Sequence, residues 1–509
     1  MTVSANKLPP EEAAAKDDST GPPASQTKGE QIGAAAIVTL AGAAVGAVLV
    51  LAGDILAVRF LGAERYGFFA LAFVIAKVCG MAAAFGLRIS ILHFLPQYLH
   101  DQQSRRLVGA VMASVTLPAY LGLFLTVLLW WTADWIAVHV FSMPLAAQYI
   151  RYAGFLIPLV ALVEVLSHVP RAFGRSLEQV LVRNLVPPAA FVLGLTVLIM
   201  TEQGPLLVMG ALILAHLLAT VLGARFVLGL LRRYAKGKGK PEVPWRTLYA
   251  YSGWVVVNDL LLLGVSSGDM LILATFVEAE QVGLYRVCVQ VGVVFYLLQH
   301  AAGAATAPVL PMLVRTKSTA ELQEIYSMVL RCIAVVMLPG FWAMAVNAQD
   351  ILIVFDPVFA SGIMALQLKA AAMTVTCGLG LSGILLSVGG FPSVEMRNSA
   401  VAFVACVILN FLLIPEWGVD GAAAAALITA VLITVLRVVQ VRRLTGVKTL
   451  HLYLLRIAIF SGVLVFLIDM LLSHLGLPHG GAVGGVAARL LITVAVAVLA
   501  LGMMGINAE

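Results

Sequence analysis

Ionisable side chains inside long apolar segments are the residues of this sequence that could carry chemistry. Lys77 lies near the middle of one apolar run, and Arg88 follows it on nearly the same face of a helix. Gly80 and Ala84 lie between them on that face, so the sequence predicts a small, open stripe that carries two cations. A charge inside the hydrocarbon of a membrane costs about 2.5–3.5 kcal/mol, so such residues usually face a cavity or a partner. The stripe therefore predicts that both cations face a cavity; the alternatives are that Lys77 pairs with an acid such as Asp54 and that Arg88 reaches the cytoplasmic headgroups.

Further intramembrane cations extend this candidate site. Arg286 and Gln290 lie one helical turn apart in a later apolar run, with His300 beyond them. For Arg286 and Arg331 the alternative is that the side chain reaches to the nearest interface, as we expect for Arg437 and Arg456. A histidine such as His300 is more often a satisfied core residue than a ligand. The candidate substrate-binding residues are Lys77, Arg88, Arg286, Lys369, Arg331 and Arg59.

Four acidic residues also fall inside apolar runs. They either pair with nearby cations or take part in coupling to protons or sodium ions, and both interpretations stay open. They are Asp54, Asp269, Asp259 and Glu164. The sequence shows no metal-ligand spacing, nucleophile motif, phosphate-binding glycine loop or catalytic carboxylate pair, so we expect no catalytic residue, no metal and no cofactor. We do not expect an enzyme.

Composition places these residues in a membrane protein. Of the 509 residues 61% are hydrophobic and 11% are charged, and the mean hydropathy is +1.00. Soluble domains carry about 25% charged residues, so a soluble enzyme is excluded. The net charge of +6 comes from cations in a few short loops, which indicates topology and excludes nucleic-acid binding.

Apolar runs of about 20 residues predict an all-α polytopic membrane protein, because helices satisfy their own backbone groups in lipid. We expect fourteen spans, at 33–60, 66–89, 106–131, 148–170, 180–200, 205–231, 248–276, 281–308, 323–346, 361–389, 396–415, 421–440, 451–472 and 486–506. Lys and Arg concentrate in alternate loops, and such loops stay in the cytoplasm. This pattern predicts that both termini are cytoplasmic.

An internal repeat organises these spans. Residues Gly53-Asp54 recur as Gly268-Asp269, and the hairpin around Glu64-Arg-Tyr-Gly67 recurs around Glu280-Gln-Val-Gly283. Six spans separate the copies, so they share one orientation, which is typical of transporters whose two bundles enclose a central cavity. The predicted domains are a disordered tail (1–32), a six-helix bundle (33–231), a basic linker (232–247), a second six-helix bundle (248–440) and two additional helices (441–509).

The first hairpin carries a resemblance to a known family. The run Ala57-Val-Arg59-Phe-Leu-Gly-Ala-Glu64-Arg-Tyr66-Gly67-Phe-Phe-Ala-Leu, with Phe85-Gly-Leu-Arg88-Ile-Ser after it, resembles the opening of bacterial polysaccharide-export flippases. These belong to the multidrug/oligosaccharidyl-lipid/polysaccharide flippase superfamily. The resemblance implies a flippase that moves an undecaprenyl-pyrophosphate-linked oligosaccharide to the periplasmic leaflet of the bacterial inner membrane. It also implies a cationic cavity for the pyrophosphate, which Lys77, Arg88, Arg286 and Lys369 fit by type and depth.

The implied partners are the lipid-linked oligosaccharide, membrane lipids, a polysaccharide polymerase and a chain-length regulator. The alternatives within the superfamily are a drug or cation antiporter and a lipid-II flippase. An antiporter predicts an acidic cavity in a twelve-span protein, which the central Lys77 and the two extra spans disfavour. A membrane glycan polymerase or ligase predicts a large extracytoplasmic loop, and every outer loop here is short.

Overall fold

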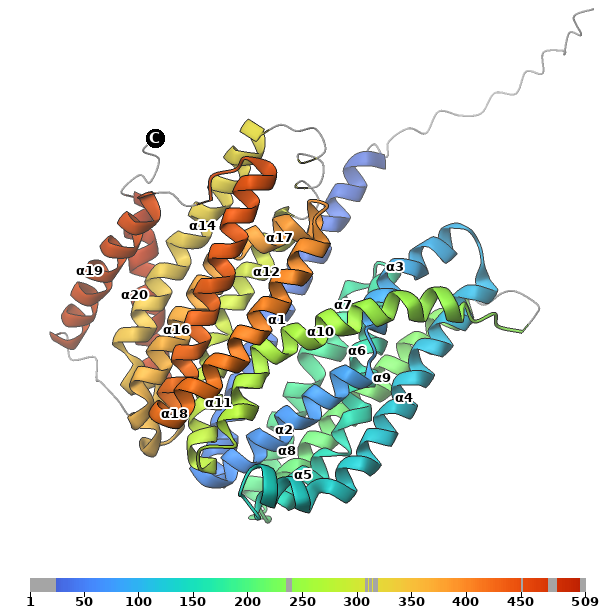
Figure 1. Cartoon of the computed structure of the whole chain (residues 1–509), viewed down its shortest axis with the longest axis horizontal. Coiled ribbons are helices and arrows are strands. Elements are labelled where there is room, and N and C mark those ends of the chain that lie inside the picture. The colour runs from blue at the N-terminus through green and yellow to red at the C-terminus, as the bar shows by residue number, and fades with distance from the viewer. Residues whose placement is uncertain are drawn as a thin grey trace, which may run out of the picture.

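The computed structural model of the chain describes residues 24–234, 240–306, 310, 314, 319–449, 452–474 and 483–503. These residues form helices and no strand (Figure 1). Thirteen helical segments are long and apolar enough to cross a membrane, which confirms the all-α membrane fold. Of the tail expected over 1–32, residues 1–23 lie outside the described part, and the first helix begins at Ala24 rather than at 33.

The first bundle is built around α2 and α6, which belong to the two most buried spans of this half. Its helices are α1 (Ala24–Leu61), α2 (Ala63–Ala83), α3 (Leu87–His100), α4 (Ser104–Trp135) with the π-helix η1 (Ile136–Val140), α5 (Ala146–Ala153), α6 (Leu156–Ala172), α7 (Ser176–Val180), the π-helix η2 (Leu181–Leu185), α8 (Val186–Met200) and α9 (Leu207–Tyr234).

The second expected span, 66–89, is broken into two helices. Phe85 and Gly86 have φ of 50° and 66°, a left-handed backbone that ends α2 and starts α3. Gly86 also lies against α10 (Trp245–Leu273), where an added Cβ would come within 2.8 Å of the Ser252 carbonyl oxygen. The break places Arg88 on the first turn of a new helix rather than on a continuation of the helix that carries Lys77.

The second bundle follows from α10. Its further helices are α11 (Ala279–Gly292), α12 (Val294–Thr306), α14 (Thr319–Val346), α15 (Ala348–Phe355), the 3₁₀ helix η3 (Pro357–Gly362), α16 (Ile363–Gly378), α17 (Leu381–Val388) and α18 (Pro392–Thr445). Residues 307–309, at the end of the expected eighth span, lie outside the described residues.

The element α18 is a hairpin of two spans. Gly418 has φ 53° and ψ −125°, which no helix allows, and it lies between the two expected spans 396–415 and 421–440. The ends of the element meet: Asn398 and Gln440 exchange amide hydrogen bonds of 2.6 and 2.8 Å. A straight helix would hold these two residues, 42 positions apart, about 63 Å from each other. Counting the two limbs separately gives fourteen spans in the described chain.

The last two helices, α19 (Leu452–His474) and α20 (Val483–Met503), pack on α14 at the outer side of the second bundle (Figure 1). Trp342 of α14 donates from its indole Nε1 to the Ala458 carbonyl oxygen at 2.9 Å. Arg489 is 2% exposed and bonds Asp469 through Nε at 2.9 Å and Ser473 through Nη2 at 2.7 Å. This buried pair fixes α20 to α19.

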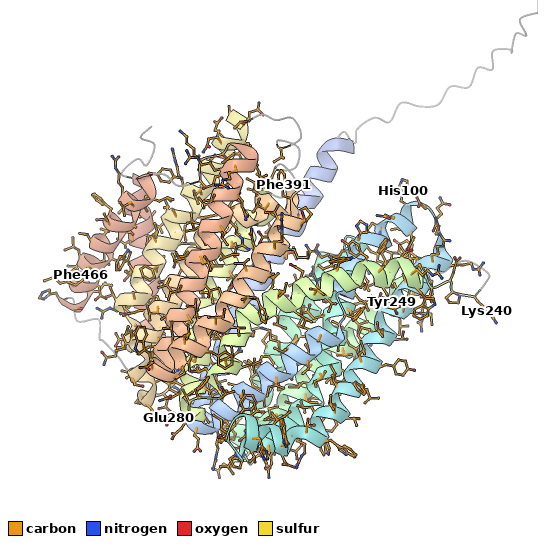
Figure 2. The ribbon with its side chains drawn as sticks, viewed as in Figure 1. His100, Lys240, Tyr249, Glu280, Phe391 and Phe466 are labelled. Carbon is orange, nitrogen blue, oxygen red and sulfur yellow. The ribbon has the colours of Figure 1, made fainter. Side chains whose placement is uncertain are left out.

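The two bundles meet at one end and diverge at the other (Figure 1). At the joined end, near Glu280 in Figure 2, α2 crosses α11 with almost no side chains between them. A Cβ on Gly67 would lie 1.7 Å from the Ala279 carbonyl oxygen, and one on Gly283 would lie 3.1 Å from the Ala63 carbonyl oxygen. Both helices therefore use Ala-x-x-x-Gly for a close crossing. His100, Lys240 and Phe391 mark the diverging end (Figure 2).

Candidate functional site: a cationic cavity between the bundles

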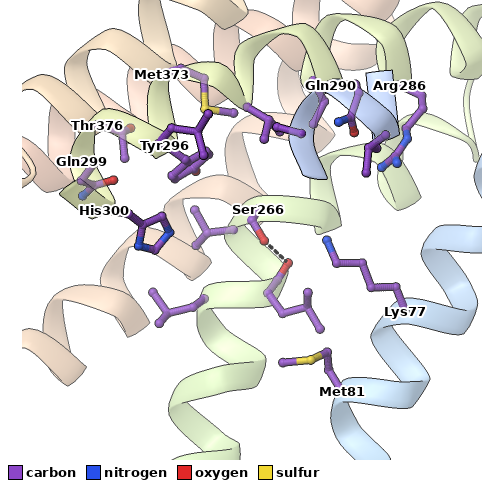
Figure 3. Close-up of a pocket in the computed structure, with 18 of the residues that line it drawn as sticks. Lys77, Met81, Ser266, Arg286, Gln290, Tyr296, Gln299, His300, Met373 and Thr376 are labelled. Atoms are coloured by element: carbon purple, nitrogen blue, oxygen red, sulfur yellow. Dashed lines mark hydrogen bonds between the residues drawn. The ribbon is translucent and has the colours of Figure 1, made fainter. Parts of the chain in front are cut away.

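A cavity of about 940 Å³ lies between the two bundles, lined by helices of both halves (Figure 3). This volume is at the upper end of the range of small-molecule sites, roughly 300–1,000 Å³. Its charged lining residues are six cations and two acids: Lys77, Arg88, Arg183, Arg286, Lys369, Arg437, Asp54 and Asp259. Cations therefore dominate the charge that faces the cavity.

Lys77 of α2 points into this cavity (Figure 3). It makes no hydrogen bond, ion pair or ring contact with any described residue, whereas Arg88, Arg183, Lys369 and Arg437 each form an ion pair with an acid. Phe73 and Met81, one turn before and after it, line the cavity on the same face. The prediction of an open stripe through Gly80 was wrong. A Cβ on Gly80 would lie 2.8 Å from the Val160 side chain of α6, so this face of α2 packs inside the bundle.

Arg88 is paired across the two bundles. Its Nη2 donates to Asp259 Oδ1 of α10 at 2.8 Å, and both residues line the cavity. Its side chain is 19% exposed, so it does not extend into the lipid headgroups. The structure thus brings Arg88 to the cavity as expected, with its charge already compensated.

Arg286 of α11 lies between a carboxylate and an aromatic ring. Its guanidinium is 5.3 Å from the ring centroid of Phe73, and it is the cation that acts electrostatically on Asp54 of α1. Asp54 accepts a hydrogen bond of 3.1 Å from the Tyr66 hydroxyl, while its Oδ2 has no partner among the described residues. A cation from the second bundle therefore faces an acid of the first.

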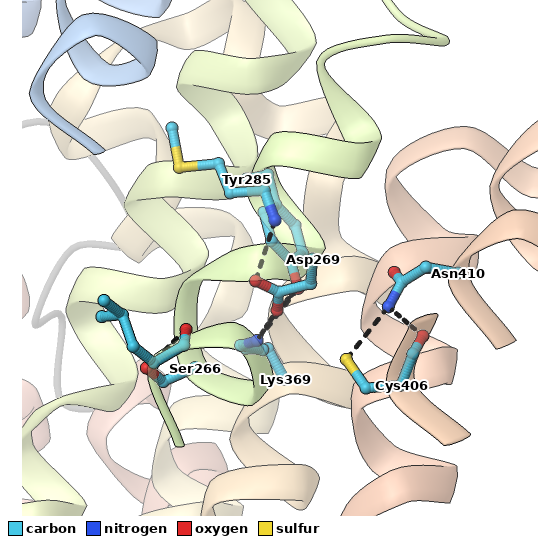
Figure 4. A network of polar contacts seen from close by, with 8 residues as sticks. Ser266, Asp269, Tyr285, Lys369, Cys406 and Asn410 are labelled. Atoms are coloured by element: carbon cyan, nitrogen blue, oxygen red, sulfur yellow. Dashed lines mark hydrogen bonds and ion pairs between the residues drawn. The ribbon is translucent and has the colours of Figure 1, made fainter. Parts of the chain in front are cut away.

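Lys369 of α16 belongs to a network that lies wholly in the second bundle (Figure 4). Its Nζ donates to Asp269 Oδ2 at 2.6 Å and to the Tyr285 hydroxyl oxygen at 2.9 Å. Tyr285 in turn donates to Asp269 Oδ2 at 2.5 Å, and the Met270 amide donates to Oδ1 at 2.8 Å. Asp269 is fully buried and does not line the cavity, so Lys369 reaches the cavity with its charge compensated.

Two cavity cations were missed by the sequence analysis. Arg183 was not among the predicted site residues and Arg437 was expected to reach the nearest interface, because each lies close to the end of an apolar run. In the structure Arg183 lies on the π-helix η2 and pairs with Glu164 at 3.2 Å, which accounts for that expected acid. Arg437 pairs with Glu395 across the α18 hairpin. Neither the residue types nor their spacing in the sequence could have predicted that Arg183 and Arg437 line the cavity.

Two expected site residues lie elsewhere. Arg59 donates to the Val354 carbonyl oxygen at 2.8 and 3.2 Å, which joins the end of α1 to α15. Arg331 of α14 lies 5.0 Å from the ring centroid of Tyr453 of α19. Neither lines the cavity, because each side chain points to a neighbouring helix on another face of its own helix. Their assignment to the cavity was wrong.

The fold and this cavity define a class of protein: a multi-pass membrane protein with two helical bundles around a polar cavity. The chain superposes on an inward-facing multidrug resistance MATE family transporter of the MOP superfamily with a TM-score of 0.68 at 15% identity, covering 81% of this chain and 99% of that one. It superposes on the lipid II flippase MurJ, in an inward closed conformation, with a TM-score of 0.67 at 12% identity, covering 92% and 98%.

The family is shown by sequence. The model of the family described as "Polysaccharide biosynthesis protein" matches residues 55–355, which is more than half of the chain. The chain belongs to this family. The resemblance noted at the first hairpin is thereby confirmed.

Two curated proteins of Haloferax volcanii are similar over part of their length. The probable flippase AglR is 28% identical over 195 residues, 38% of this chain and 41% of that protein. The probable low-salt glycan biosynthesis flippase Agl15 is 26% identical over 207 residues, 40% of this chain and 43% of that protein. The chain thus matches about two fifths of the length of these relatives.

Proposed function

We propose that this protein flips a polyprenyl-pyrophosphate-linked oligosaccharide across its membrane for polysaccharide or glycan assembly. In a bacterial cell the carrier would be undecaprenyl pyrophosphate, and the movement would run from the cytoplasmic to the periplasmic leaflet of the inner membrane. The observation that carries the proposal is Lys77, a cation without an ion pair among the described residues, in a cavity where four of the other five cations form an ion pair with an acid. Family membership and the names of the two relatives support it.

The electrostatics of the cavity suit an anion that must be bound and released. A pyrophosphate diester carries about two negative charges, and a charge-assisted hydrogen bond is worth about 1.5–3 kcal/mol. One uncompensated ammonium offsets part of the desolvation of the anion, while the paired arginines hold the walls in place. A cavity of six uncompensated cations would bind the anion too tightly for release.

The direction of transport follows from charge. An inside-negative potential favours outward movement of an anion by roughly 2.3 kcal/mol per charge per 100 mV. Removal of the product by a polymerase with its chain-length regulator, or countertransport of an ion, would act in the same direction. Asp54, Asp259, Asp269 and Glu164 remain our candidates for ion coupling.

The conformation supports loading from the cytoplasm. The bundles diverge at the end that holds His100 and Lys240 (Figure 2), beside the basic linker that the distribution of Lys and Arg places inside the cell. The chain also superposes better on the inward-facing MATE transporter, with a TM-score of 0.68, than on an outward-facing one, with 0.56. A cytoplasmic lipid-linked glycan would enter at this end.

A drug or cation antiporter of the same fold is the second candidate, since MATE transporters share the architecture. An organic cation would need uncompensated acid in the cavity. Asp259 is bonded to Arg88, Asp54 lies within the electrostatic reach of Arg286, and the six lining cations outnumber the two lining acids. The charge of the cavity therefore favours an anionic substrate.

The decisive experiment compares Lys77→Ala with Lys77→Arg in a strain that lacks the gene. Glycan export is measured and normalised to the amount of protein in the membrane. We expect Lys77→Ala to lower export roughly ten- to hundredfold, from the loss of one charge-assisted bond, and Lys77→Arg to keep part of it. Arg331→Ala is the matched control, because it removes an intramembrane cation outside the cavity. Normal export by well-expressed Lys77→Ala would refute the proposal.

A further inference from the structure

One wall of the cavity carries uncharged side chains with unused hydrogen-bonding capacity. The residues of this neutral wall are Tyr296, Gln299, His300 and Thr376. None of them makes a side-chain hydrogen bond or ion pair with a described residue. Their polar atoms are also not among the buried atoms without a partner, so they reach the open space of the cavity.

The neutral wall belongs to the second bundle and lies across the cavity from Lys77 of the first. Tyr296, Gln299 and His300 lie on α12 within a little over one turn, and Thr376 lies on α16, which packs against α12. Figure 3 shows these four side chains gathered on one side of the cavity, with Lys77 entering from the other. Lys77 and these four uncharged side chains therefore lie on opposite sides of the cavity.

The chemistry of the neutral wall matches hydroxyl groups rather than charge. An amide, an imidazole and a phenol each donate and accept hydrogen bonds, as sugar hydroxyls do, and the Tyr296 ring adds an apolar face. A hydroxyl that loses water without finding a partner costs about 1–3 kcal/mol. A glycan carries several hydroxyls. A wall of open donors and acceptors compensates the loss of water from these hydroxyls, whereas a purely apolar or cationic wall would not.

We propose that the neutral wall is a glycan subsite, which binds the first sugars of the substrate while Lys77 binds its phosphate. This inference rests on the proposed function, and it assigns the discrimination between glycans to α12 and α16. It separates two tasks: Lys77 binds the phosphate, which is common to all carriers, and the neutral wall binds the sugars, which differ between carriers. Side chains with free hydrogen-bonding groups discriminate strongly against a ligand that leaves them unpaired.

The test uses the purified full chain and soluble short-chain carriers. The probes are farnesyl pyrophosphate, bare or bearing glucose, galactose or N-acetylglucosamine, and dissociation constants are measured by quenching of tryptophan fluorescence. The variants are Gln299→Leu and Thr376→Val. The matched control is Thr374→Val on the same helix, because the Thr374 hydroxyl already donates to the Ala370 carbonyl oxygen at 2.8 Å. Lys77→Ala completes the set.

We expect the wild type to bind at least one glycosylated probe more tightly than the bare one. Gln299→Leu and Thr376→Val should each lose about three- to tenfold of affinity for that probe, as for one lost hydrogen bond, and bind the bare probe normally. Thr374→Val should behave as the wild type. Equal wild-type affinity for all probes, or equal weakening of bare and glycosylated probes in the variants, would overturn the glycan subsite. Unchanged binding of the bare probe by Lys77→Ala would instead overturn the phosphate site.

Discussion

Two buried carboxylates, Asp54 and Asp269, hold equivalent places in the internal repeat, yet their cations have different origins. Each accepts a hydrogen bond from a tyrosine hydroxyl, at 3.1 Å from Tyr66 and at 2.5 Å from Tyr285. Asp269 takes its cation, Lys369, from its own bundle, whereas Asp54 faces Arg286 of the other bundle. The first acid is therefore sensitive to a separation of the bundles, and the second is not.

Residue type and depth were enough to find four cavity cations: Lys77, Arg88, Arg286 and Lys369. They were not enough to reject Arg59 and Arg331, because the depth of a residue in a span says nothing about which neighbour its face meets. The partners of each cation could not be predicted either. An ion pair such as Lys369–Asp269 joins residues 100 positions apart, and only helix packing brings them together.

The Asp269–Lys369 pair gives the first prediction. Both side chains are nearly fully buried, so removing one partner leaves an uncompensated charge, which costs about 3–5 kcal/mol. We expect Asp269→Asn and Lys369→Met each to lower the Tm of the detergent-purified protein, and the double variant to recover part of the loss. Lys77→Ala should leave the Tm unchanged, because it breaks no bond. A double variant as unstable as the sum of the singles would show that the pair is not coupled.

At the scale of the elements, the spans were predicted well and their interruptions were not. Apolar length indicates that a segment crosses the membrane, but a break needs a local backbone change that hydropathy does not record. The left-handed Phe85-Gly86 step and the π-helix η2 are such changes, and they place Arg88 and Arg183 at the cavity. Two separate spans on either side of Gly418, 396–415 and 421–440, were expected, and the structure has them as the two limbs of α18.

The repeat motif has a physical explanation in the crossing of α2 and α11. Gly67 leaves no room for a side chain: its Cβ would lie 1.7 Å from the backbone oxygen of Ala279. Gly67→Ala should force the helices apart and favour the conformation open at this end, whereas Gly283→Ala, at 3.1 Å, should have a smaller effect. Gly210→Ala is the control, because nothing lies within 4 Å of that position.

The measurement for the Gly67→Ala variant is the labelling of a cavity position from the extracytoplasmic side. A Ser266→Cys substitution supplies the thiol on the cavity lining, in a background without the five native cysteines. We expect its reaction with a membrane-impermeant reagent to become several-fold faster in Gly67→Ala and to stay unchanged in Gly210→Ala. Equal labelling rates in all variants would contradict the inference that the α2–α11 crossing closes the cavity at this end.

For the whole molecule, the orientation in the membrane is a prediction from the loops. His139 lies near the joined end of the first bundle and Lys240 at the diverging end, and both are exposed. A thiol introduced by His139→Cys should react with an impermeant reagent in intact cells. One introduced by Lys240→Cys should react only after the membrane is permeabilised. The reverse pattern would invert the topology and the direction of loading.

The joined and diverging ends of the two bundles predict how the cavity opens first to one side of the membrane and then to the other. A cavity that opens only between diverging ends must close there and separate at the α2–α11 crossing to release its substrate on the other side. Thiols introduced by Ala63→Cys and Ala279→Cys, one on each bundle, can be joined by a short bifunctional reagent that dithiothreitol cleaves. We expect this link to stop glycan export and its cleavage to restore export.

The matched control for that link lies at the same end of the molecule but within one bundle. Asp134 of α4 and Arg151 of α5 form an ion pair, so Asp134→Cys and Arg151→Cys place two thiols within reach of the same reagent. Because the two helices belong to one bundle, linking them should leave export intact. Export that persists with residues 63 and 279 linked would mean that the bundles do not separate at this crossing. Loss of export in both linked pairs would mean that the reagent acts on something other than the motion between the bundles.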